Sequence, residues 1–116
     1  MVRYGERTLQ CDIMKLKWHG HASFRITSSL GTSIVTDPYV PQTSGYKPFT
    51  EPADIVVISS DNDSFHCNAH LVPGPHVTIN ALELARSKQP HVERDITIHA
   101  IEAMEAMEAL NHRERK

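Results

Sequence analysis

Four consecutive apolar residues, Ile55-Val-Val-Ile58, constrain the fold more than any other stretch of this sequence. The run is short and β-branched, which is typical of a strand buried on both faces. Such strands lie in sheets that carry layers on both sides. The polar stretch SSDNDSFHCNAH, residues 59–70, follows the run directly and has the composition of a ligand-bearing loop.

Alternating segments predict the neighbouring strands. Met14, Leu16 and Trp18 alternate with lysines, which is the period of a half-buried strand. Residues 24–27 and 33–36 flank a turn and read as two further strands, so two or three antiparallel strands are expected at the start of the domain. Additional strands are expected at 76–79 and 96–98, and helices at 65–71, 81–87 and 101–111.

The segment between the third strand and the buried run is predicted to be a long surface loop. Asp37-Pro38 ends the strand, because proline cannot continue a central ladder. Residues 38–53 contain four prolines and Gly45. Long loops without regular structure are often functional in compact domains.

Length and composition limit the classes of protein to which this chain can belong. The 116 residues are enough for one domain: a polar leader at 1–13, a domain at 14–112 and a charged tail at 113–116. The net charge of −2 gives no electrostatic case for a nucleic acid or an anionic membrane as partner. The two cysteines form no C-x-x-C pair, which favours a reducing cytoplasm, and no apolar run is long enough to cross a bilayer.

Three segments in this order, MKLKWHGHASFRI, SIVTDPY and ADIVVIS, carry a family resemblance. The chain resembles the N-terminal half of the metallo-β-lactamase superfamily over roughly Met14 to His112. Members of that superfamily are αββα sandwiches that hold one or two metal ions, usually zinc. The resemblance therefore implies an α/β (α+β) fold that is half of such a sandwich, with a mostly antiparallel or mixed sheet and flanking helices. It also implies descent from zinc-dependent hydrolases of small molecules.

The family's metal loop, H-x-H-x-D-H, is altered in this chain. Laid on the sequence without a gap, its ligand positions fall on Ser60, Asn62, Ser64 and Phe65, none of which is a good zinc ligand. The resemblance therefore implies a degenerate site that has changed its metal or lost it.

A different set of ligands lies in the same loop. His66 and His70 are four residues apart, so a helix would bring them to one face, and aspartates precede them. We predict a substituted metal site on Asp61, Asp63, His66 and His70, for zinc or for a harder ion such as manganese or iron. The alternative is that Asp63 caps a helix with exposed histidines and that no metal binds.

Two residues outside the loop are candidate catalytic residues. His21 resembles the family's histidine at the rim of the metal cleft, and Asp37 resembles the aspartate that supports the metal loop from behind. Both also have ordinary alternatives: His21 as a residue that ties down a bend, and Asp37 as a turn residue. Cys67 is expected to be a small core residue.

The resemblance covers about half of a usual family domain, which has consequences for partners. Half of a sandwich leaves one sheet face uncovered and an edge unpaired, and both features favour association. We therefore expect a homo-oligomer, such as a dimer, or a partner chain that completes the sandwich. The alternative to a hydrolase is a catalytically inactive relative that serves as a binding or assembly module.

Overall fold

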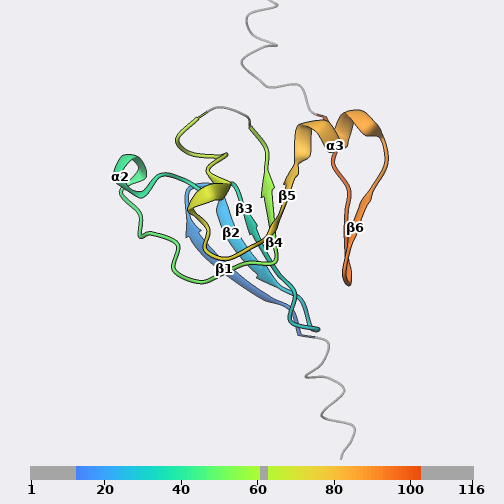
Figure 1. The fold of residues 1–116 in the computed structure, drawn as a ribbon, viewed down its shortest axis with the longest axis horizontal. Helices are drawn as coiled ribbons and strands as arrows, with labels where there is room; N and C mark the ends of the chain where they lie inside the picture. The colour runs from blue at the N-terminus through green and yellow to red at the C-terminus, as the bar shows by residue number, and fades with distance from the viewer. Residues whose placement is uncertain (1–12, 61–62, 103–116) are drawn as a thin grey trace, which may run out of the picture.

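A mixed five-stranded sheet forms the centre of the domain in the computed structural model, which describes residues 13–60 and 63–102 (Figure 1). The strand order is β1-β2-β3-β4-β5, with β1 to β3 antiparallel and β3, β4 and β5 parallel. The sheet strands are β1 (Lys15–Gly20), β2 (Ser23–Thr27), β3 (Ser33–Thr36), β4 (Ile55–Ile58) and β5 (Val77–Asn80). The other elements are α2 (Pro41–Ser44), η1 (Ala69–Leu71, a 3₁₀ helix), α3 (Ala81–Ser87) and the hairpin strands β6 (His91–Glu93) and β7 (Ile96–Ile98). The predicted α/β class with a mixed sheet is confirmed.

Strand β4 is buried on both faces, as its sequence predicts. Val56 pairs in register with Val35 of β3, and both belong to a core cluster with Tyr39 and Phe49. The adjacent Ile55 belongs to the cluster on the other side of the sheet, which includes Ile34 and Ile79. Successive residues of a strand point to opposite faces, so β4 is the strand that joins the two cores.

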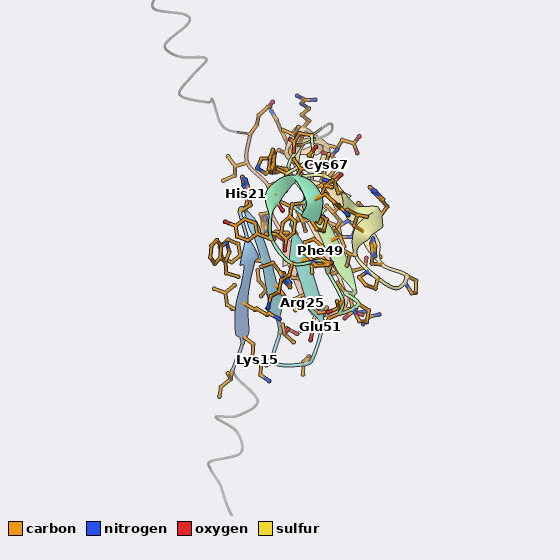
Figure 2. The ribbon with its side chains drawn as sticks, turned by 90° about the vertical axis from the view of Figure 1, so that its left-hand side faces the viewer. Lys15, His21, Arg25, Phe49, Glu51 and Cys67 are labelled. Atoms are coloured by element: carbon orange, nitrogen blue, oxygen red, sulfur yellow. The ribbon has the colours of Figure 1, made fainter. Side chains whose placement is uncertain are left out.

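The loop at residues 38–53 lies at the surface, as predicted, but some of its residues are buried against the sheet. It folds across one face of the sheet, where Tyr39 and Phe49 are 1% and 7% exposed. The buried Arg25 of β2 holds it there, donating from Nη2 to the carbonyl of Glu51 (2.7 Å) and from Nη1 to that of Pro52 (2.9 Å). Figure 2 shows Phe49, Arg25 and Glu51 on this side of the sheet.

The other face is covered only in part. The β6–β7 hairpin and α3 lie at the β5 side of the sheet (Figure 1). Asp95 accepts a hydrogen bond from Thr32, and Arg94 forms an ion pair with Asp54 at 3.1 Å, so both fix the hairpin turn. At the opposite edge, Leu16 and Trp18 of β1 are 68% and 57% exposed. Strand β6 was not predicted, because its sequence is polar.

The helix predictions had mixed outcomes. The helix at 81–87 is confirmed as α3, whose N-terminus Asn80 caps by accepting from the backbone N–H groups of Leu82 and Glu83. The helix at 65–71 is wrong, since only residues 69–71 form a 3₁₀ turn, and Asn68 before it has a non-helical backbone. Of the helix expected at 101–111, residues 103–111 lie outside the described residues. Within the described part of the chain, no helix is long and apolar enough to cross a membrane.

Candidate functional site

The carboxyl ends of the parallel strands β3 and β4 form one edge of the sheet, where polar side chains gather. Asp37 follows β3 and Ser59 follows β4. The Asp37 carboxylate accepts hydrogen bonds from the backbone N–H of Ser59 (2.8 Å) and from its hydroxyl (2.9 Å). Crevices at the carboxyl ends of parallel strands are the usual place for ligand sites in open α/β sheets.

Asp37 has an unusual backbone conformation, and its carboxyl is partly buried. Its φ of 39° lies in the left-handed region, which non-glycine residues adopt rarely. Burial raises the pKa of the Asp37 carboxyl, and the two hydrogen bonds from Ser59 oppose this rise. The hydrogen bonds from Ser59 hold the start of the loop against Asp37. The same geometry serves a turn residue and a supporting carboxylate.

Asp63 organises the loop that follows. Its Oδ1 accepts from the backbone N–H groups of Phe65 and His66, both at 2.7 Å, and its Oδ2 accepts from the hydroxyl of Ser60 at 2.7 Å. Cys67 closes the turn, because its sulfur lies 3.1 Å from both the backbone N and the backbone O of Asp63. Asp63 thus caps a single turn instead of a helix.

His66 is held by the same carboxylate. Its Nδ1 lies 3.1 Å from both oxygens of Asp63, and about a third of each side chain is exposed. A carboxylate at Nδ1 fixes the proton on that nitrogen and leaves Nε2 as a free lone pair. Hydrogen bonds from Ser60 and from the turn lower the pKa of Asp63, so it stays ionised at neutral pH.

A second imidazole approaches from the β1–β2 bend. His21, with φ 55°, packs its ring at 4.6 Å from the Phe65 ring and at 5.9 Å, nearly perpendicular, from the His66 ring. Figure 2 places His21 and Cys67 near the same end of the sheet. The fold therefore brings together three predicted site residues, His21, Asp63 and His66, with Asp37 close enough for its pKa to depend on the charges of the last two.

The sequence matches a known protein family. The family model of the β-lactamase superfamily domain matches residues 15–114. The chain belongs to the metallo-β-lactamase superfamily. No curated protein matches it, and no solved structure does.

The metal centre usual for this superfamily can be tested against the residues present. Among residues 13–60 and 63–102, no group of three or more His, Cys, Asp or Glu side chains is arranged to hold an ion. Of the four ligands predicted from the sequence, only Asp63 and His66 are in contact; His70 lies in η1, and Asp61 lies outside the described residues. The described residues therefore do not fit a zinc ion.

Several contributors to the site were not predicted. Ser59 donates a hydrogen bond to the carboxylate of Asp37, and Ser60 donates one to that of Asp63. The His19 ring packs on Phe49, with ring centroids 5.0 Å apart.

The acid sensitivity of the loop follows from Asp63. The pKa of the Asp63 carboxyl is lower in the folded chain than in the unfolded chain. The ionised carboxylate therefore stabilises the fold fully at pH values above the unfolded-state pKa. This stabilisation is lost as the pH falls toward the folded-state pKa. We expect Asp63→Asn to lower the free energy of unfolding at neutral pH, and to have a smaller effect at about pH 2.5. Urea denaturation at both pH values measures this; an equal loss at both would contradict it.

Proposed function

We propose that the chain forms part of a hydrolase site in which His66, oriented by Asp63, acts as the general base. The observation that carries the proposal is the contact of His66 Nδ1 with both oxygens of Asp63 at 3.1 Å. Membership of a superfamily of hydrolases and the position at the carboxyl ends of β3 and β4 support it.

The proposed reaction uses one group of the chain, the His66 imidazole. With its proton fixed on Nδ1, His66 accepts a proton at Nε2 from a water molecule, and that water attacks the acyl carbon of an ester or thioester. The C–O or C–S bond then breaks, and the leaving group takes the proton from the imidazolium. General base catalysis of this kind is worth about 10²–10⁴-fold in rate.

Hydrolysis of p-nitrophenyl acetate by the purified chain tests the proposal. We expect His66→Gln to lower kcat/KM by about 100-fold and Asp63→Asn by about 10-fold, since the imidazole then loses its oriented tautomer. His76→Gln is the matched control, because the Nδ1 of His76 is hydrogen-bonded to the carbonyl of Gly74 in its own turn. Equal activity of the His66 and His76 variants would refute the proposal.

A second candidate function, an assembly module, is favoured by the apolar face of β1. Met14, Leu16 and Trp18 alternate on one face and are each more than half exposed, whereas Lys15 and Lys17 occupy the other face. Lysines on an edge strand discourage extension of the sheet, so a second copy of the chain would pack on the apolar face instead.

Solution mass tests this second candidate. We expect light scattering of the wild-type chain to give a dimer, and Leu16→Glu to give a monomer, because a carboxylate cannot be buried unpaired in an apolar contact. Leu30→Glu is the control, since Leu30 is 77% exposed and lies in the β2–β3 turn. A wild-type chain that stays monomeric at about 100 μM would exclude a stable dimer.

A further inference from the structure

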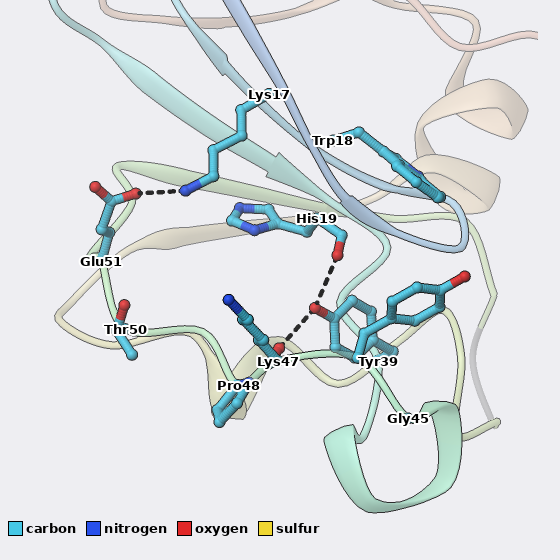
Figure 3. A pocket seen from close by; sticks show the side chains of 10 residues that line it. Lys17, Trp18, His19, Tyr39, Gly45, Lys47, Pro48, Thr50 and Glu51 are labelled. Carbon is cyan, nitrogen blue, oxygen red and sulfur yellow. Dashed lines mark hydrogen bonds and ion pairs between the residues drawn. The ribbon is translucent and has the colours of Figure 1, made fainter.

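A cavity of about 670 Å³ opens between β1 and the loop at residues 45–51 (Figure 3). This volume lies within the range of small-molecule sites. The cavity is separate from the Asp63–His66 pair, neither of which lines it. Its walls are formed by Lys17, Trp18, His19, Tyr39, Tyr46, Lys47 and their neighbours.

Positive charge dominates the polar wall. Lys17 and Lys47 both line the cavity, whereas the chain as a whole carries a net charge of −2. Glu51 is the acidic residue of the lining, and it lies 3.8 Å from Lys17 with both side chains about 60% exposed. Exposed pairs at this separation are worth little, so a ligand anion can take the place of Glu51 beside Lys17 at small cost.

His19 adds a neutral aromatic ring to the lining. Burial and the nearby charges of Arg25 and Lys17 lower the pKa of His19, so the ring is neutral at pH 7. Its Nε2 is buried and has no hydrogen-bond partner among the described residues.

The remaining wall is aromatic. Trp18 and Tyr46 meet edge to face, with ring centroids 5.9 Å apart. Tyr39 closes the inner side, where its hydroxyl donates to the carbonyl of Lys47 at 2.7 Å and lies 3.3 Å from that of His19 (Figure 3). The loop side of the cavity is therefore fixed before any ligand binds, and the rings offer contact to an apolar group.

We propose that this cavity binds a small organic carboxylate. The anionic group lies between Lys17 and Lys47, and the apolar body packs against Trp18 and Tyr46. Two cationic side chains match a carboxylate, and the aromatic wall favours an organic anion over an inorganic one. The site is independent of the hydrolytic activity proposed for Asp63 and His66.

The tryptophan reports binding directly, because Trp18 is the single tryptophan of the chain. Titration of the full chain with benzoate, with excitation at about 295 nm, is expected to give a saturable change in fluorescence. Benzamide has the same ring without the charge and should bind at least about 10-fold more weakly.

Two variants should change the affinity for benzoate in opposite directions, and a third serves as the control. Lys47→Met should weaken benzoate binding by about 10-fold, whereas Glu51→Gln should tighten it severalfold, since it removes the competing carboxylate. Lys15→Met, on the same strand but outside the cavity lining, should leave the affinity within about 2-fold.

Three outcomes would overturn the proposal: no saturable change with benzoate up to about 10 mM, equal affinities for benzoate and benzamide, or equal effects of Lys47→Met and Lys15→Met. Urea denaturation of each variant confirms that the fold is intact, so that a loss of binding reports on the site.

Discussion

Gly20→Ala should destabilise the fold by roughly 3–4 kcal/mol, one of the two largest effects we expect. A Cβ atom at this position would lie 2.4 Å from Cγ of Tyr46, well inside contact distance, and the backbone φ is +139°. The Tyr46 ring also contacts Trp18 and Tyr39, at centroid distances of 5.9 and 5.7 Å, so moving it away would break both contacts. Urea denaturation measures the loss.

Two further variants separate the clash from the backbone strain. Gly31 also has a positive φ, +91°, but nothing lies within 4 Å of its Cβ position, so Gly31→Ala should cost only about 1–2 kcal/mol. Tyr46→Ala removes the ring that Gly20→Ala would strike, so the double variant should lose less than the sum of the single variants. Equal costs for Gly20→Ala and Gly31→Ala would show that Tyr46 does not rest on Gly20.

Arg25→Met should cost about 3 kcal/mol, because it removes two charge-assisted hydrogen bonds that hold the loop at 38–53 on the sheet. Arg25 is 8% exposed, and its Nε lies 3.4 Å from the Glu51 carboxylate as well. Loss of this anchor should also make the loop near Lys47 a preferred site for trypsin, since a detached loop exposes its backbone. Urea denaturation and limited proteolysis measure the two effects.

Arg86→Met is the matched control for Arg25. Arg86 also faces a carboxylate, that of Glu102 at 3.4 Å, but its side chain is 65% exposed. Pairs of this kind are worth about 0–1 kcal/mol. If the two arginine variants lost the same stability, Arg25 would not be the anchor of the loop.

Local pattern was enough to predict most of the sheet. The β-branched run at 55–58 and the alternation along β1 to β3 each depend on neighbouring residues only, and the structure has strands at these places. The loop at 38–53 could not be predicted in the same way. The packing of this loop on the sheet depends on Arg25, which lies far away in sequence. It also depends on aromatic residues that stand among prolines in the sequence, where exposed positions are expected.

The candidate site was predicted in part for a similar reason. The family resemblance led to His21 and Asp37, and the loop composition led to Asp63 and His66, which the fold does bring to one end of the sheet. The spacing of His66 and His70 suggested a shared helical face, but Asp63 captures the backbone N–H groups of Phe65 and His66 and ends the turn early. Side-chain competition for backbone donors is what the helical pattern leaves out.

The cavity beside β1 was not predicted at all. Its lining comes from two segments, residues 17–19 and 39–51, whose proximity depends on the loop crossing the sheet. Residues 38–53 contain a single lysine, Lys47, so the sequence of the loop has no charge pattern that would indicate a binding site.

The central claim is that Asp63 fixes the proton of His66 on Nδ1 and leaves Nε2 free. Nitrogen-15 NMR of the histidine side chains tests it most directly, because the two neutral tautomers give distinct pairs of shifts. The account predicts the Nδ1–H form for His66 in the wild-type chain, and its loss in Asp63→Asn. A proton found on Nε2 of His66 in the wild-type chain, or the same tautomer in both chains, would contradict it.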